Sequence, residues 1–315
     1  DSIMTAHIQF PALDDSGDPA TLSKPIMTDL LRGELGYDGV VVTDSLRMEG
    51  VRQMYPDEEI PVRALQAGVD LMLMPFDIDV AYNAVLDAVA SGELTEERID
   101  ESVTRILRLK FDRGIVADPF VDPDAIDDVV GVPEHLEVAQ DIADRSTTLV
   151  QNNGMLPLSA DSGSALVTGW GETSPKTLAD GLTARGVDAE ALSTGDDPDQ
   201  EAIDAAVAAA EDKDLVVLTV NNARDDEGQL ALAEALREAG KPVAVVALNQ
   251  PYDVAHMTEV DSYLAAYSYG GAALEAVVRT LFAEVNPSGK LPVTIPTADD
   301  PDVPLYEIGH GLSYE

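Results

Sequence analysis

The stretch Gly39–Met48, GVVVTDSLRM, decides how this chain folds. Its first half is continuously apolar, which is typical of a strand covered on both faces of a parallel sheet. Asp44 follows at the carboxyl end of that strand, the end at which chemistry collects in parallel α/β barrels. Position alone leaves two interpretations of Asp44 open: a carboxylate that attacks a substrate, or a cap of the next turn or helix.

Apolar strand patterns and helical patterns alternate around this stretch, which predicts a parallel sheet. We expect strands at Ser2–Ile8, Gly39–Asp44 and Leu71–Met74, with helices over residues 23–36, 79–90 and 95–114. An eight-stranded barrel needs about 250 residues and eight such units. Residues 1–115 are therefore predicted to be the C-terminal three βα units of a (β/α)8 barrel.

A second alternating pattern begins near Thr147 and predicts a doubly wound α/β/α sandwich over residues 146–315. Between the two modules, residues 116–145 contain three residue–proline pairs that break regular structure, so we assign them as a linker that ends in a short helix. Strands of the second module are expected at Thr147–Asn152, Ala165–Gly169, Ala189–Leu192, Leu215–Val220, Val243–Leu248 and Tyr263–Tyr267. Helices are expected near Lys176–Arg185, Glu201–Glu211, Gln229–Ala239 and Ala272–Ala283.

Composition excludes several classes of function. The net charge of −40, from 19 basic and 59 acidic residues, argues against nucleic acid as a partner, because phosphates would be repelled. The same charge suits a protein of a salt-rich cell, in which dense salt screens self-repulsion, and the alternative is a moderately acidic protein of a high-GC bacterium. Cysteine is absent, which excludes disulfides, thiolate chemistry and cysteine-ligated zinc sites. The four histidines lack the spacing of metal ligands. No apolar run approaches the roughly 20 residues of a membrane-spanning helix. The chain starts directly on a strand pattern, so we expect it to begin inside a domain.

Motifs along nearly the whole chain resemble glycoside hydrolase family 3, and they occur in the order of that family. The segments that carry the resemblance are MTAHI (Met4–Ile8), PALD (Pro11–Asp14), PATLS (Pro19–Ser23), ELGYDGVVVTD (Glu34–Asp44), ALQAGVDLMLMP (Ala64–Pro75), LVQNN (Leu149–Asn153), NQPYD (Asn249–Asp253), NPSGKLP (Asn286–Pro292) and GHGLSY (Gly309–Tyr314). The segments from Met4 to Ser23 are most similar to the β-N-acetylglucosaminidase branch of the family.

The resemblance implies a role for four residues. Asp44 matches the catalytic nucleophile of the family. His7, at the end of the preceding strand, would face the same sugar pocket, although a hydrogen-bonded core histidine is the alternative. Arg47 and Met48 follow the nucleophile and would line the rim of the pocket, unless they are simply a solvated arginine and a packed methionine.

The resemblance also implies an activity. It is that of a retaining exo-glycosidase that releases β-linked N-acetylhexosamine through a glycosyl-enzyme intermediate on Asp44, with water or phosphate accepting the sugar, and with no cofactor and no metal. The implied partner is a carbohydrate. In this branch the general acid/base is a His–Asp pair that precedes the first strand seen here, so we expect the chain alone to be inactive. The alternatives are a β-glucosidase or β-xylosidase, or a non-catalytic fragment that needs an upstream barrel half.

Two other patterns invite a functional interpretation that we do not favour. Other branches of the family take a glutamate acid/base from the second domain, but we interpret Asp225, Asp226 and Glu227 as a solvated loop. Gly169-Trp-Gly171 follows a strand as in dinucleotide-binding loops, but Ser174 stands where the third glycine is needed. A tight turn is the simpler interpretation of that segment. Gly309-His-Gly311 is expected to belong to a tail that docks on the second domain.

Overall fold

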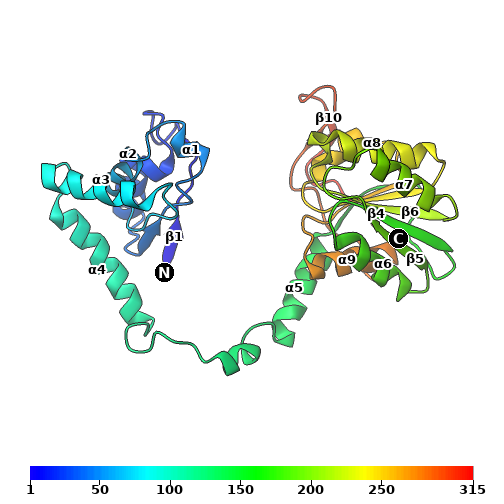
Figure 1. Cartoon of the computed structure of the whole chain (residues 1–315), viewed down its shortest axis with the longest axis horizontal. Helices are drawn as coiled ribbons and strands as arrows, with labels where there is room; N and C mark the ends of the chain where they lie inside the picture. Colours follow the sequence, from blue (N-terminus) through cyan, green and yellow to red (C-terminus); the bar gives the residue numbers. More distant parts are fainter. Residues whose placement is uncertain (315) are drawn as a thin grey trace. The chain divides into compact units, whose positions relative to one another are not determined.

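The computed structural model describes residues 1–314 and divides into two compact units, Asp1–Pro123 and the part of the chain from Asp124 onward (Figure 1). This division falls inside the segment 116–145 that we assigned as a linker. The first unit contains β1 (Ser2–Met4), η1 (Ala20–Leu22), η2 (Pro25–Glu34), β2 (Val40–Val42), α1 (Glu49–Arg52), α2 (Glu59–Ala67), α3 (Ile78–Ser91) and α4 (Glu96–Asp112).

The second unit is built on a six-stranded sheet in the order β3-β8-β7-β6-β4-β5. Five strands are parallel and β3 pairs antiparallel with β8, a departure from the all-parallel expectation. The strands are β3 (Thr148–Asn152), β4 (Ser164–Gly169), β5 (Asp188–Ser193), β6 (Leu215–Val220), β7 (Val243–Ala247) and β8 (Ser262–Ala265). The remaining elements are η3 (Pro123–Asp128), α5 (Pro133–Ser146), α6 (Ser174–Thr183), α7 (Gln200–Ala210), η4 (Ala223–Asp225), α8 (Glu227–Glu238), η5 (Pro251–His256), α9 (Gly271–Leu281), β9 (Ile295–Pro296) and β10 (Pro304–Tyr306).

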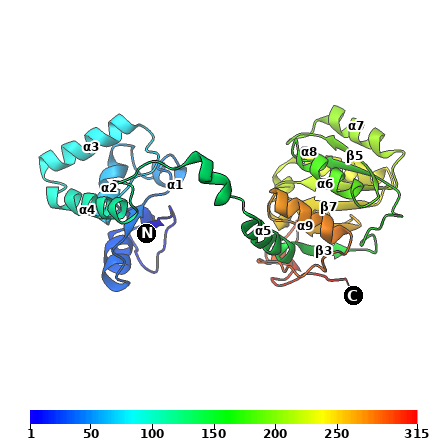
Figure 2. The same ribbon diagram turned by 90° about the horizontal axis from the view of Figure 1, so that it is seen from below.

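Helices cover both faces of this sheet, which confirms the predicted α/β/α sandwich. Helices α7 and α8 pack on one face and α6 and α9 on the other, each through its own cluster of buried aliphatic residues (Figures 1 and 2). Strand β6 is buried at all six of its residues. Burial on both faces explains why its sequence, LVVLTV, is almost entirely apolar.

Helix α5 belongs to the second unit. Its Asp144 carboxylate accepts a hydrogen bond of 2.6 Å from Arg279 of α9, and Gln140 donates to the carbonyl of Ala272. Only the segment that precedes this helix fits the description of a linker. Phe120 and Val121 there are more than four-fifths exposed.

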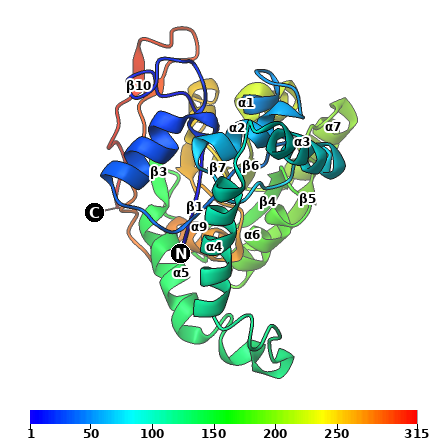
Figure 3. The same ribbon diagram turned by 90° about the vertical axis from the view of Figure 1, so that its left-hand side faces the viewer.

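The C-terminal tail lies along the outer edge of β3, as the docking expectation required (Figure 3). The amide of Leu312 donates to the carbonyl of Leu149 at 2.7 Å, and Nε2 of His310 donates to the carbonyl of Val150 at 2.8 Å. A side chain at Gly311 would place its Cβ 2.4 Å from the carbonyl oxygen of Gly289. Glycine is therefore required for this close approach.

The first unit has a short parallel pair at its centre. Strand β1 pairs with β2 in the register Ser2 with Val40 and Met4 with Val42. Beyond β2, the predicted strand Leu71–Met74 is wrong, because it is reduced to a single parallel bridge between Val42 and Leu71. Strand β1 is also shorter than the predicted Ser2–Ile8 and ends at Met4.

A buried carboxylate ties this small sheet to the helices around it. Asp70 accepts hydrogen bonds from Arg32 at 2.7 Å, Arg105 at 3.2 Å, Ser102 at 2.6 Å and the amide of Val41 at 2.9 Å. Its side chain is fully buried. A buried charge is tolerated only when it is paired and hydrogen-bonded, and this carboxylate joins η2, β2 and α4. The network lies at the amino end of β2, opposite the end that carries Asp44.

Candidate active site

Asp44 lies two residues after β2, in a short arch formed by residues 43–46 at the carboxyl end of the strand. Its side chain is half-buried. The carboxylate accepts a hydrogen bond of 2.6 Å from the amide of Ser45. Asp44 does not cap a helix, since α1 begins at Glu49 with Met48 as its N-terminal cap residue. The alternative interpretation is therefore wrong for the helix, while the bond from the Ser45 amide leaves Asp44 beside the turn that follows.

The segment after the Val42–Leu71 bridge holds one side of this arch. The amide of Leu73 donates to the side-chain hydroxyl of Thr43 at 2.9 Å, and the carbonyl of Leu73 accepts from the amide of Leu46 at 3.0 Å. Met74 follows with a left-handed backbone, φ 47°. The residues on both flanks of Asp44 are thus fixed to one point of the neighbouring segment.

His7 holds the other side of the arch. Its Nε2 lies 3.0 Å from the carbonyl oxygen of Ser45, and its Nδ1 lies 2.8 Å from the hydroxyl of Thr21. A carbonyl only accepts, so Nε2 carries a proton. Both ring nitrogens of His7 are engaged with the protein itself, which is the hydrogen-bonded arrangement named above as the alternative to a sugar contact.

Arg47 and Met48 lie on the exposed side of the arch. The guanidinium carbon of Arg47 is 5.9 Å from the centre of the Phe76 ring, and that of Arg52 is 3.9 Å from the same ring. Met48 is 46% exposed. Arg47 is therefore a stacked surface residue and Met48 is not packed in the core. Both positions are compatible with a pocket rim.

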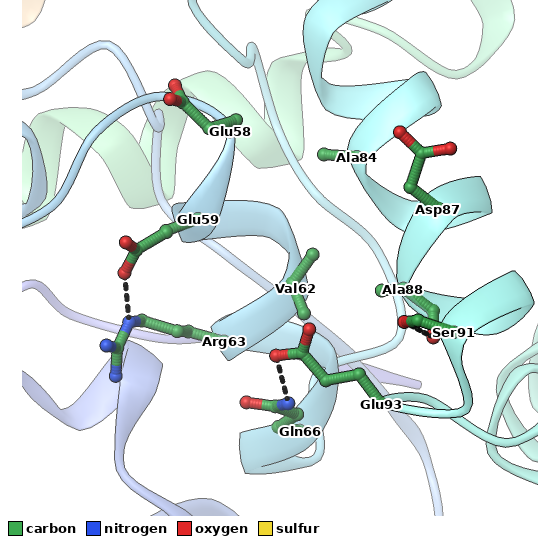
Figure 4. Close-up of a pocket in the computed structure, with 10 residues that line it drawn as sticks. All are labelled: Glu58, Glu59, Val62, Arg63, Gln66, Ala84, Asp87, Ala88, Ser91 and Glu93. Carbon is green, nitrogen blue, oxygen red and sulfur yellow. Dashed lines mark hydrogen bonds and ion pairs between the residues drawn. The ribbon is translucent and has the colours of Figure 1, made fainter.

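A wide groove of about 650 Å³ lies elsewhere in the first unit, between α2 and α3. Figure 4 shows its lining, in which Glu59 pairs with Arg63 and Glu93 accepts from Gln66. None of the four predicted site residues lines it. Within residues 1–314, no group of three or more His, Cys, Asp or Glu side chains is arranged to hold a metal ion, and no helix is long and apolar enough to cross a bilayer.

The acidic run of the second unit is partly structural. Asp226 caps α8, because its carboxylate accepts from the backbone amide and the side chain of Gln229. Asp225 pairs with Arg224, and both are exposed. The expectation of a wholly solvated loop is therefore wrong for Asp226. At the carboxyl end of β4, Gly169 has φ 113° and its Cβ would meet the Thr219 carbonyl oxygen of β6 at 2.2 Å, so this close approach requires glycine.

Sequence reasoning missed Thr43 and Leu73 as parts of the site. From the sequence, Thr43 belongs to the predicted strand Gly39–Asp44 and Leu73 to a predicted strand that does not form, and neither residue has a predicted role in the site. A hydroxyl directly before the acidic residue was the available signal, because a buried threonine in a strand needs a hydrogen-bond partner. Its partner could not be inferred without the register of the neighbouring segment.

Comparison with known proteins places both units in one family. The profile of the glycosyl hydrolase family 3 N terminal domain matches residues 1–109, and that of the family 3 C-terminal domain matches residues 147–314. A family 3 β-N-acetylglucosaminidase from Paenibacillus sp. shares the fold with a TM-score of 0.80 and 33% identity, over 92% of this chain and 57% of that one.

Curated relatives carry several activities in their names. The lysosomal beta glucosidase of Dictyostelium discoideum is 30% identical over 95% of this chain and 44% of its own length. Beta-hexosaminidase A of Pseudoalteromonas piscicida is 38% identical over 50% of this chain and 29% of its own length. A beta-xylosidase of Formosa agariphila is 27% identical over 99% of this chain and 53% of its own length. The chain thus spans about half the length, or less, of these relatives. It belongs to the glycoside hydrolases of family 3.

Proposed function

We propose that this chain carries the nucleophile of a retaining exo-glycosidase, and that Asp44 is that nucleophile. The observation that supports this most directly is the arch at the carboxyl end of β2, in which hydrogen bonds to Thr43 and Ser45 fix the residues on both sides of the half-buried Asp44. In the proposed step, a carboxylate oxygen of Asp44 forms a bond to the anomeric carbon. The glycosidic C–O bond breaks, and its electron pair leaves with the aglycone oxygen.

For the substrate we propose a β-linked N-acetylhexosaminide. The support is the segment Met4–Ser23, whose motifs are most similar to those of the β-N-acetylglucosaminidase branch, together with the similarity to the Paenibacillus enzyme. A β-glucoside or β-xyloside is the second candidate, because relatives named for those activities align with nearly the whole chain.

We further propose that a general acid must be supplied by another barrel segment. Within the described residues, both nitrogens of His7 are already bound to protein groups. The partner would be the upstream barrel half, whose strands would pair beside β1. Without acid assistance, hydrolysis of an ordinary aryl glycoside should be slower by about 10²–10⁴-fold, so we expect little turnover by this chain alone.

An activated substrate tests the proposal without that acid. A 5-fluoro-N-acetylglucosaminyl fluoride has a leaving group that needs no proton and forms a long-lived glycosyl-enzyme. We expect mass spectrometry of peptides to find the sugar on Asp44 in the wild-type chain and no label in Asp44→Asn. The matching glucosyl fluoride, tested in parallel, separates the two candidate substrates by their labelling rates.

Asp57→Asn is a matched control, because Asp57 is a carboxylate of the same unit, paired with Arg52, that the proposal does not use. Labelling should survive that change. Sugar attached to a residue other than Asp44, or equal labelling of Asp44→Asn, would show that the nucleophile has been misassigned.

A further inference from the structure

The pairing between β2 and the segment from Leu71 follows a regular parallel ladder at its start. The amide of Leu71 donates to the carbonyl of Val41 at 3.0 Å, and the amide of Thr43 donates to the carbonyl of Leu71 at 3.0 Å. A parallel ladder repeats every two residues. Its next two bonds would run from the Leu73 amide to the Thr43 carbonyl, and from the Ser45 amide to the Leu73 carbonyl.

Neither of those two bonds forms. The Leu73 amide donates instead to the side-chain hydroxyl of Thr43 at 2.9 Å. The Leu73 carbonyl accepts from the amide of Leu46, at 3.0 Å, rather than from that of Ser45. The arch therefore contains one residue more than a regular ladder allows, as in a β-bulge, a distortion that re-aims side chains and is frequent beside active sites.

Because the Leu73 carbonyl is bound by Leu46, the amide of Ser45 is free to donate to the carboxylate of Asp44. In a regular ladder the Ser45 amide would bind the Leu73 carbonyl. Here it donates to Oδ1 of Asp44 at 2.6 Å. The same exchange explains why the predicted strand ends early. Both backbone groups of Leu73 are already hydrogen-bonded. The chain then turns away at Met74 with φ 47°, a backbone conformation that residues other than glycine rarely adopt.

We propose that Thr43 is a positioning residue for Asp44. Its hydroxyl replaces its own carbonyl as the acceptor of the Leu73 amide, and this replacement inserts the extra residue that aims the Asp44 carboxylate out of the sheet. Thr43 is fully buried, so water cannot supply the missing acceptor. The inference goes beyond the proposed function, and it rests on that function only in calling Asp44 the nucleophile.

Two substitutions at this position separate the hydroxyl from the shape of the side chain. Thr43→Val keeps the volume and removes the acceptor, whereas Thr43→Ser keeps the acceptor. Thr168→Val is the matched control, since Thr168 is a fully buried threonine in β4 of the second unit whose hydroxyl donates to the carbonyl of Leu192 at 2.7 Å. All three variants are made in the full chain.

The first measurement does not depend on catalysis. NMR of the chain reports hydrogen exchange at the Leu73 amide and the carboxyl carbon resonance of Asp44. In Thr43→Val we expect protection of the Leu73 amide to fall at least tenfold and the Asp44 resonance to move. Thr43→Ser and Thr168→Val should match the wild type. A folded Thr43→Val with Leu73 protection and the Asp44 resonance unchanged would overturn the proposal, even if its melting temperature is lower.

The second measurement is the rate at which the fluorinated sugar labels Asp44. Misplacing a reacting group by about 1 Å costs about 100-fold. We therefore expect labelling of Thr43→Val to be slower by about that factor, and Thr43→Ser to stay within about threefold of the wild type. Equal rates for Thr43→Val and the wild type overturn the proposal. If the wild type itself is not labelled, the proposed nucleophile fails, and the NMR comparison alone decides the role of Thr43.

Discussion

Asp253, in η5 of the second unit, is a fully buried carboxylate that is hydrogen-bonded to the loop after β6. Its Oδ1 accepts from the amide of Arg224 at 3.1 Å, whereas Oδ2 has no partner among the described residues. Burial raises the pKa of Asp253 above its usual value, because desolvation outweighs the hydrogen bonds from the loop amides. The hydroxyl of Tyr263 is likewise buried with no hydrogen-bond partner in residues 1–314.

We predict that Asp253 makes stability depend on pH. A carboxyl whose pKa is raised in the folded state binds its proton more tightly there, so its contribution is complete below the unfolded pKa and is lost as pH rises through the folded pKa. Asp253→Asn mimics the protonated form and lacks this dependence. As pH rises above about 3.9, the ordinary pKa of an aspartate, the stability of the wild type relative to Asp253→Asn should therefore fall. Urea unfolding of both proteins measures it, and parallel pH profiles would contradict the prediction.

The candidate site was predictable only in part at the level of residues. The apolar run Val40–Val42 followed by Asp44 indicates a carboxylate at a strand end, and the structure places it there. His7 was identified through the family resemblance, and the strand that was expected to end beside it stops at Met4. Thr43 was not identified, because its function depends on which backbone amide lies opposite it. Hydrogen-bond register is a property of two segments, and a single-strand pattern does not contain it.

At the scale of elements, the second unit was easier to predict than the first. Strand β6 has the predicted bounds, because an apolar run covered on both faces has an unambiguous sequence. The antiparallel direction of β3 was missed, since a buried strand has the same composition in either direction. Helix α2 was missed because Pro61 interrupts its pattern, although proline fits in a first turn.

We predict that limited proteolysis will cut first in the first unit or in the segment between Val116 and Pro133. That segment is largely exposed, and exposed chain is the preferred site of nicking. The first unit has only two short strands and two isolated bridges among its described residues, whereas the second has a six-stranded sheet covered on both faces. A resistant C-terminal fragment should therefore accumulate on gels.

The packing of helix α5 also predicts where the resistant fragment begins. Because it packs on α9 through the Asp144–Arg279 pair, the N-terminus of the resistant fragment should lie before Pro133. N-terminal sequencing of the fragment gives the cut position. A stable fragment that begins at the start of β3, or a first unit that outlasts the second, would contradict the assignment.

The whole molecule carries a net charge of −40. Like charges at such density repel one another and oppose the compact state. Salt shortens the range of that repulsion to about 3 Å at 1 M. We predict that the melting temperature rises when dilute buffer is replaced by molar KCl, and differential scanning calorimetry measures the shift.

Sucrose separates charge screening from the general effect of a cosolute, because it stabilises by exclusion from the protein surface without screening charge. Potassium chloride should act at concentrations at which sucrose does not. An unchanged melting temperature in molar KCl would remove the argument for a protein of a salt-rich cell.

The docking of the tail on β3 links local unfolding of the tail to self-association. Tyr314 packs against the core of the second unit, burial raises the pKa of its hydroxyl to about 12, and its amide is held by Asn286. The tail can leave β3 only after this ring has left the core. Once it has done so, the backbone of β3 around Leu149 loses its cover, and a bare strand edge is a template for another chain. Molecules with a released tail would then be the ones that join into larger assemblies, while molecules with a docked tail keep that edge closed.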